Sequence, residues 1–132
     1  RDMVEALPDG PERALWQQRL ESQRAIVQHL YQLGVPLLAG SDAGWRATAF
    51  DTFWKELDEL VVAGLSPSAA VAAATGNASR TLGIGECCGT VKPGLIADLV
   101  AVEGDLSADI RCLSRVQVVI KRGRVVRMPR DV

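Results

Sequence analysis

Apolar residues recur at helical spacing in the first part of the chain. Between residues 12 and 33 they interrupt a polar run every three to four positions, which predicts one long helix. Asp9 stands in the turn before it as a capping residue, and Gly34 is placed to end it, because glycine adopts the left-handed conformation without steric penalty. The stripe that we expect this helix to bury comprises Ile26, Val27, Leu30, Tyr31 and Leu33.

Two further helices are predicted downstream, followed by a short helical turn. Residues 51–63 carry an apolar face, and Gly64 follows as a stop signal. That face comprises Phe53, Leu57, Leu60 and Val61. Residues 66–75 are mostly alanine, which suits close packing against another element, and residues 77–82 add the short turn.

Between the long helix and these helices, residues 35–39 form an almost continuous apolar run. Such a run is typical of a strand covered on both faces, as in a parallel α/β sheet, and Pro36 is tolerated near the start of a strand. The helical half offers no second strand to pair with it. We therefore expect the C-terminal strands, another copy of the chain or a larger α/β barrel to supply its neighbours.

The C-terminal part changes to short strands and turns. Turn signals occur at Pro93-Gly94 and at Arg122-Gly123, with a loop at residues 103–114. The predicted strands are residues 89–91, 97–102, 116–120 and 124–126. The last two make a hairpin, so the sequence predicts a helical part followed by a small β part.

Composition limits the classes of function. The chain has 132 residues, 48% of them hydrophobic, and a net charge of -1 at pH 7, which fits one globular core and favours neither nucleic acid nor an anionic membrane as a partner. We expect no membrane anchor and a reduced, cytoplasmic setting, since there is neither a signal peptide nor a long apolar run. The basic stretch 121–130 is interpreted as a solvated hairpin turn and terminus.

The cysteines give no metal motif. Cys87, Cys88 and Cys112 form no CxxC pair, and the chain has a single histidine, His29, so the sequence favours free thiols over a structural zinc site. Nothing in the sequence assigns the three thiols a role.

Asp42 is the strongest candidate for chemistry. In LLAGSDAG it directly follows the apolar run and is bracketed by Gly40 and Gly44. Aspartate is common in such turns because its side chain bonds nearby backbone N–H groups, so a purely structural turn is one reading. A carboxylate at the end of a buried strand can equally be a metal ligand or a proton acceptor.

Four blocks in order resemble a known family. They are VPLLAGSDAG, ELDELVVAGLSPSAAVAAATGNASRTLGIG, GTVKPGLIADLVAVEGD and VIKRGRVV, spanning residues 35–126. Together they resemble the C-terminal portion of a metal-dependent amidohydrolase of the imidazolonepropionase or Xaa-Pro dipeptidase-like branch. The resemblance implies an α/β fold in which residues 1–85 form the end of a (β/α)₈ barrel and residues 86–132 part of a small β-sandwich.

The same resemblance implies a role for Asp42. It corresponds to the aspartate that closes the eighth barrel strand, binds a divalent metal, with zinc expected, and takes the proton of the metal-activated water. The implied reaction is hydrolysis of a C–N or ester bond in a small-molecule substrate. Asp98, in the third block, is expected to make a structural hydrogen bond.

The other metal ligands of the family have no counterpart in the sequence. Its His-x-His block is absent, and His29 lies on the flank of the predicted long helix. We therefore expect this to be a C-terminal fragment, inactive and without tightly bound metal by itself, because a catalytic metal takes three or more protein ligands. A full barrel needs about 250 residues, so we expect self-association, as a dimer, to cover the exposed surface.

Two other readings stay open. The chain can be a non-catalytic scaffold or interaction module that keeps the fold without the site. Alternatively, residues 40–44 read as a G-x-D-x-G nucleophile elbow, although residues 45–50 separate Asp42 from the next predicted helix and no histidine follows it.

Overall fold

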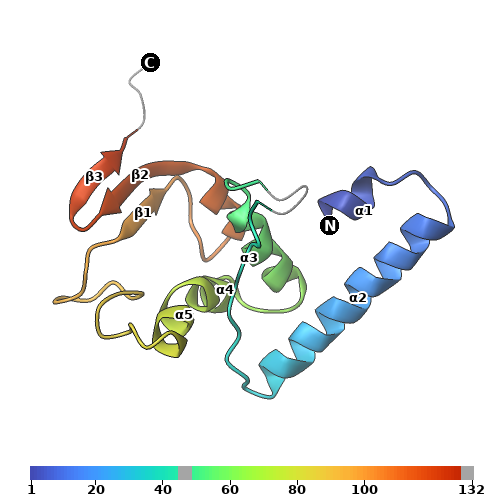
Figure 1. Ribbon diagram of the computed structural model, residues 1–132, viewed down its shortest axis with the longest axis horizontal. Coiled ribbons are helices and arrows are strands. Elements are labelled where there is room, and N and C mark those ends of the chain that lie inside the picture. Colours follow the sequence, from blue (N-terminus) through green and yellow to red (C-terminus); the bar gives the residue numbers. More distant parts are fainter. Residues whose placement is uncertain (45–48, 129–132) are drawn as a thin grey trace.

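The computed structural model describes residues 1–44 and 49–128. Within them the chain forms helices α1 (Asp2–Ala6), α2 (Pro11–Gln32), α3 (Phe53–Val62), α4 (Pro67–Ala74) and α5 (Gly76–Thr81), strands β1 (Leu99–Val102), β2 (Val116–Lys121) and β3 (Arg124–Arg127), and the 3-10 helix η1 (Ile110–Ser114). Helices α3 to α5 occupy the middle of the molecule, the sheet lies to one side, and α2 extends on the other (Figure 1). The fold is therefore mixed, with helices first and a small antiparallel sheet last.

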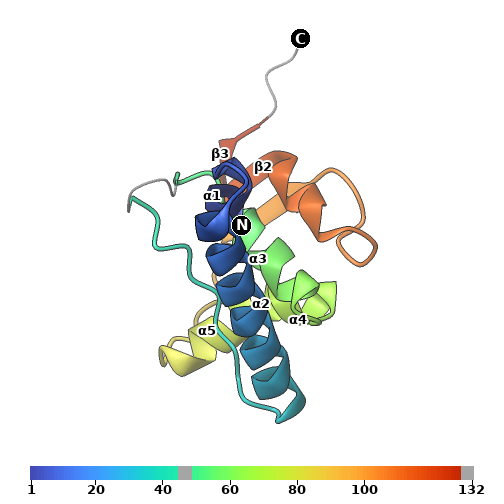
Figure 2. The same ribbon diagram turned by 90° about the vertical axis from the view of Figure 1, so that its right-hand side faces the viewer.

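The long predicted helix is confirmed as α2, and the burial predicted for its stripe is found only in part, because Val27 and Leu30 are half-buried and Val27 packs against the core. No residue of α2 is buried, and Ile26 and Leu33 are 59% and 65% exposed. A helix can bury an apolar stripe only against another surface, and α2 packs mainly on α1 and α3 within the described residues. Turned by 90°, the molecule shows α2 running along the front of the other helices (Figure 2).

The start of α2 also differs from the prediction. Gly10 is the N-cap residue, and no side chain caps the helix. The carboxylate of Asp9 instead accepts a hydrogen bond from Arg13 Nη1 at 2.6 Å. Pro11 stands at the first helical position, where the missing N–H costs nothing.

The core joins α3, α4 and η1. Its buried residues are Leu57, Leu60, Leu65, Ala70, Ala73 and Ile110. Alanines on α4 let its backbone approach α3 closely, and Ser66 caps α4 by accepting from the N–H of Ala69 at 3.2 Å. Ile110 comes from the C-terminal part, so one cluster ties that part to the helices.

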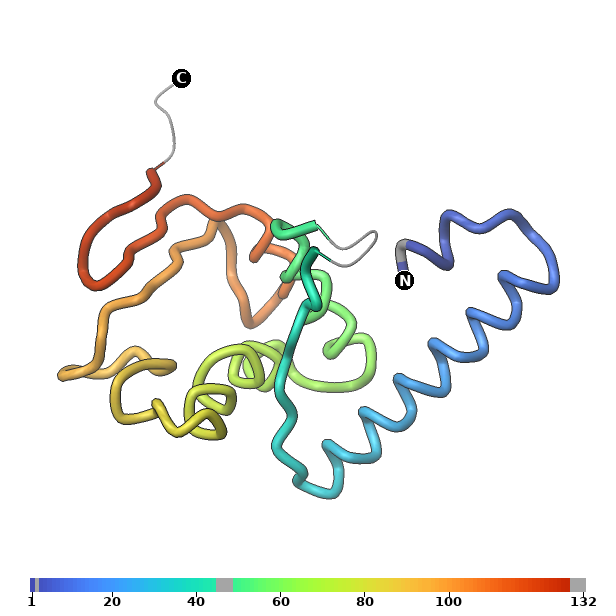
Figure 3. The backbone as a smooth tube through the Cα atoms, viewed as in Figure 1, coloured from blue at the N-terminus to red at the C-terminus, as the bar shows by residue number. Residues whose placement is uncertain are grey.

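The strand predicted at residues 35–39 is not formed. This segment is extended but has no ladder partner in the described part of the chain. It crosses the helices as a single strand-like stretch (Figure 3), with Leu37 and Ala39 packed against the core. Strand pairing needs a second backbone alongside, and none of the described strands lies there.

The sheet has the order β1-β2-β3, antiparallel throughout. The strands predicted at residues 116–120 and 124–126 are confirmed as β2 and β3, and that at 97–102 is shortened to β1. The strand predicted at 89–91 is wrong, because Gly89 has a φ of 93° and packs tightly on α5. A Cβ there would lie 2.1 Å from the Ser79 hydroxyl oxygen.

Asp98 fastens the hairpin turn of this sheet. Its carboxylate accepts from the backbone N–H of Arg122 at 2.8 Å and from the Lys121 ammonium. The Lys121 hydrogen bond, followed by that of the Arg122 N–H, lowers the pKa of Asp98. The expected structural role of this residue is confirmed.

Candidate functional site

Asp42 lies at the end of the extended segment, on its exposed face. From residue 37 to residue 44 burial alternates with the period of a strand. Half-buried positions are Leu37, Ala39, Ser41 and Ala43, and exposed positions are Leu38, Gly40, Asp42 and Gly44. The half-buried side includes the two residues that pack on the helical core, so Asp42 faces away from the helices.

The backbone at Asp42 is unusual. Its φ is 47°, in the left-handed region that L-residues rarely adopt and that aspartate tolerates better than most. Such a conformation costs about 1–3 kcal/mol and is found preferentially at functional sites. Gly44, with a φ of 93°, continues the turn.

A backbone hydrogen bond fastens the segment just before Asp42. The N–H of Ala39 donates to the carbonyl oxygen of Ala73, at the end of α4, at 3.2 Å. Burial raises the pKa of the half-buried Glu56 on α3, and the nearby backbone N–H of Gly40 opposes that rise.

The Asp42 carboxylate is available for a ligand. No hydrogen bond or ion pair joins it to another described residue. Across residues 1–44 and 49–128, no three His, Cys, Asp or Glu side chains gather where they could hold a metal ion. Asp42 therefore fits a divalent metal as one hard oxygen ligand, and the described residues do not complete the set.

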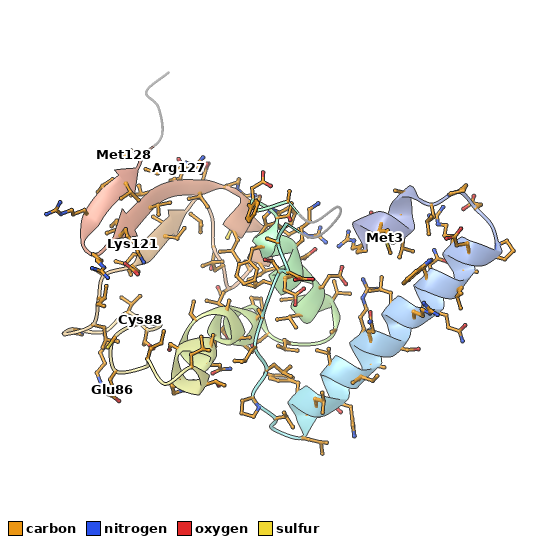
Figure 4. All side chains as sticks on the ribbon, viewed as in Figure 1. Met3, Glu86, Cys88, Lys121, Arg127 and Met128 are labelled. Atoms are coloured by element: carbon orange, nitrogen blue, oxygen red, sulfur yellow. The ribbon has the colours of Figure 1, made fainter. Side chains whose placement is uncertain are left out.

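Histidine and cysteine do not join Asp42. His29 is exposed in the last turn of α2. All three cysteines are free thiols: Cys87 is exposed, Cys88 half-buried and Cys112 buried. Figure 4 places Cys88 and Glu86 on the loop after α5, away from the extended segment.

The nucleophile-elbow reading gains no support. An elbow should lead directly into a helix, and none begins within residues 43, 44 and 49–52. The stretch 45–48 that also belonged to this reading lies outside the described residues. The next helix in the described part of the chain is α3, which begins at Phe53.

The sequence did not predict a second polar cluster, which forms around Asp58 and Glu59 on α3. Asp58, only 6% exposed, accepts from Arg1 Nη1 and from Arg111 Nε, each at 3.0 Å. Its neighbour Glu59 accepts from Arg24 Nη2 at 2.6 Å and Nε at 2.9 Å. Arg1 precedes α1, Arg24 lies on α2 and Arg111 lies in η1. No local sequence pattern could have paired them with α3.

Comparison with known proteins identifies the family. Residues 9–126 match the sequence profile of the amidohydrolase family. The chain belongs to the amidohydrolase family. The resemblance noted in the four sequence blocks is thereby confirmed, and no curated protein sequence matches the chain.

Solved structures give the same answer. An Xaa-Pro dipeptidase with methionine bound in its active site is 34% identical, with a TM-score of 0.71 over 77% of this chain and 25% of its own. A putative prolidase from Bifidobacterium longum is 30% identical, with a TM-score of 0.73 over 80% and 27%. Phenylurea hydrolase B is 27% identical, with a TM-score of 0.64 over 76% and 26%.

The chain thus spans about a quarter of the length of these solved relatives. Its described helices include none with the length and apolarity needed to cross a membrane.

Proposed function

We propose that this chain supplies Asp42 to the active site of a metal-dependent hydrolase, and that this site acts on C–N or ester bonds of small molecules. The observation that carries the proposal is the position of Asp42. It ends a strand-like segment, faces away from the helical layer, and its carboxylate, on a left-handed turn, has no partner among the described residues. In a (β/α)₈ barrel, catalytic groups stand at the C-terminal ends of the strands, which is where Asp42 stands on this segment.

The relatives support the bond type. Two of the similar structures are named as an Xaa-Pro dipeptidase and a putative prolidase, and a third as a phenylurea hydrolase. Peptide and urea substrates share a carbonyl carbon bonded to nitrogen. A C–N bond is therefore the substrate feature that we favour for the complete site.

Asp42 would serve this chemistry in two ways. Its carboxylate would act as an oxygen ligand to a divalent metal, with zinc proposed, and would accept the proton of the attacking water. The metal, when bound, would lower the pKa of that water. The remaining ligands would have to come from outside the described residues, so we propose that the chain by itself is inactive and holds no metal tightly.

The finer architecture belongs to the same proposal. Residues 1–85 would form the last helix–strand–helix units of a barrel, and residues 86–132 part of a β-sandwich, in a cytoplasmic protein. Two surfaces favour self-association as a dimer: the apolar face of α2, and β3, where Val125 and Val126 are 53% and 62% exposed. A sedimentation profile that stays monomeric at all concentrations would contradict the dimer.

A non-catalytic scaffold is the second candidate. It is favoured by the fact that the described residues bring only one oxygen ligand to the end of the segment. In that case Asp42 would serve the turn alone, and its charge would be dispensable.

A graft distinguishes the two candidates. The segment of the Xaa-Pro dipeptidase that this chain matches would be replaced by the chain, and metal content and hydrolysis of an Xaa-Pro dipeptide measured. We expect an active graft, with kcat reduced about 10²–10⁴-fold by Asp42→Asn. The matched control is Asp51→Asn, an exposed aspartate near α3 that should leave kcat unchanged. Full activity of Asp42→Asn would favour the scaffold.

A further inference from the structure

We propose that Cys87 and Cys88 form a dithiol site for a soft, thiophilic atom with two exchangeable positions, and that a trivalent arsenical with one organic substituent is the class of ligand. The two residues are adjacent in the sequence, and both are free thiols. Cys88 lies on the loop after α5 (Figure 4), and neither thiol takes part in the chemistry proposed for Asp42. The site is therefore independent of the proposed function.

The carbonyl group of Ile84 folds both cysteines into one turn. Its oxygen accepts from the Cys87 N–H at 2.9 Å and from the Cys88 N–H at 3.2 Å. These are the contacts of a helical turn, in which successive side chains are rotated by about 100° around the axis. In an extended strand they would point to opposite faces. The two thiols therefore leave the chain on neighbouring sides.

The turn is fixed before and after the pair. The carbonyl oxygen of Cys87 accepts from the Ile96 N–H at 2.8 Å, which ties the turn to the stretch that leads into β1. Gly89, directly after Cys88, has a φ of 93° and packs closely on Ser79 of α5. Because the backbone is already ordered, a ligand that joins the two side chains has little backbone entropy to remove.

Both thiols are open to a reagent. Cys87 is exposed and Cys88 is half-buried. The Cys88 thiol donates to the Ile84 carbonyl oxygen at an Sγ–O distance of 3.8 Å, and a thiol is a weak donor that a ligand can displace. Cys112 is fully buried in η1, so we expect it not to compete for a ligand in the folded chain.

The adjacency of the two thiols selects the ligand. A structural zinc ion takes four ligands, and across residues 1–44 and 49–128 no three His, Cys, Asp or Glu side chains gather. A disulfide usually joins Cα atoms about 4.4–6.8 Å apart, whereas those of neighbouring residues are about 3.8 Å apart. A soft atom between the sulfurs lengthens the bridge, and thiolates are its preferred ligands. An arsenic atom with one organic substituent has two positions left, which matches the pair.

The reaction needs no oxidant. Phenylarsine oxide forms one As–S bond to Cys87 and one to Cys88, and its bond between arsenic and oxygen breaks. The two thiol protons leave with that oxygen as one water molecule. Arsenic stays trivalent, and neither sulfur is oxidised.

The first test titrates the folded chain with phenylarsine oxide and counts the remaining thiols with a chromogenic disulfide. We expect one equivalent to remove both accessible thiols, while Cys112 reacts only after unfolding in urea. Excess mercaptoethanol should not release the arsenical, whereas dimercaptopropanol should, because only a second dithiol competes with a two-bond bridge. Loss of a single thiol per equivalent would overturn the proposal, and so would a mass spectrum in which one arsenical joins two chains.

The second test separates the pair from its members. Cys87→Ser and Cys88→Ser should each weaken the binding of phenylarsine oxide about 10²-fold or more, because a single thiol lacks the effective concentration of its neighbour. Cys112→Ala is the matched control and should keep the original affinity, with circular dichroism showing that each variant is folded. If Cys112→Ala does not fold, the thiol count of the original chain still decides. Tight binding retained in either serine variant would show that the two thiols do not act as one site.

Discussion

Asp42 and Asp58 are the same residue type in opposite circumstances. Asp58 is 6% exposed and hydrogen-bonded to two arginines, on a helix that belongs to the core. Asp42 is exposed at the end of an extended segment, on a left-handed backbone, and no described residue binds its carboxylate.

The difference separates structure from chemistry. A buried carboxylate without partners would cost several kcal/mol, so Asp58 can exist only with its arginines and is fully engaged by them. An exposed carboxylate needs no partner for the chain to fold, and it stays free for a ligand. In this molecule strong pairing therefore indicates a structural residue, and an exposed carboxylate that has no described partner indicates the candidate site.

The largest effect should come from the core that surrounds Asp58. Leu57 lies on the buried face of α3 and is 3% exposed. Leu57→Ala should therefore lower the free energy of unfolding by about 3 kcal/mol. Leu38→Ala, in the extended segment at 45% exposure, should cost less than about 1 kcal/mol. Urea denaturation measures both. Equal losses would mean that the segment is as much a part of the core as α3.

Removing the buried carboxylate itself comes next. Asp58→Ala removes the acceptor that Arg1 and Arg111 share, although Arg1 keeps its bond to Glu5. We expect a loss of roughly 2–3 kcal/mol, reduced from the fully buried case because both guanidinium groups are partly exposed. The matched control is Asp9→Ala, which removes an exposed pair with Arg13 and should cost less than about 0.5 kcal/mol. Similar values for the two variants would refute a structural role specific to Asp58.

At Asp42 the backbone, not the charge, should control stability. Asp42→Val places a β-branched residue at a φ of 47° and should cost about 1–2 kcal/mol. Asp42→Asn tolerates the same conformation and should stay within about 0.5 kcal/mol of the original chain. Thermal unfolding followed by circular dichroism checks both. A large loss in Asp42→Asn would show that the charge has a structural partner.

The smallest effect is a pH dependence at Glu56. Its pKa in the folded chain is raised above 4.5, so its contribution to stability is present below that pH and is lost as the pH rises through the folded-state pKa. Relative to Glu56→Gln, the original chain should therefore become less stable between about pH 4 and about pH 7. The midpoint of urea unfolding at the two pH values measures this difference, and a constant difference would contradict the raised pKa.

Local patterns predicted the elements well where each element needs only its own residues. The extent of α2 followed from helical spacing, and the β2–β3 hairpin from the turn at Arg122-Gly123. The order of the four blocks was enough to predict the family that the profile match confirms. Asp42 itself could be selected from its place after an apolar run.

Predictions failed where an element depends on a distant partner. Ile26 and Leu33 of the predicted stripe stay exposed because no described surface covers them, and residues 35–39 form no strand because no described backbone pairs with them. The Asp58 cluster joins positions 1, 58 and 111, a pairing that no sequence window contains.

The sequence by itself determined the helices, the hairpin, the family and the chemical type of the candidate residue, since these depend on side-chain spacing and residue identity. Only the tertiary structure decided that Asp42 faces away from the helices and that its backbone is left-handed. The physical reason is that burial, strain and hydrogen-bond partners are set by segments that meet only when the chain is folded.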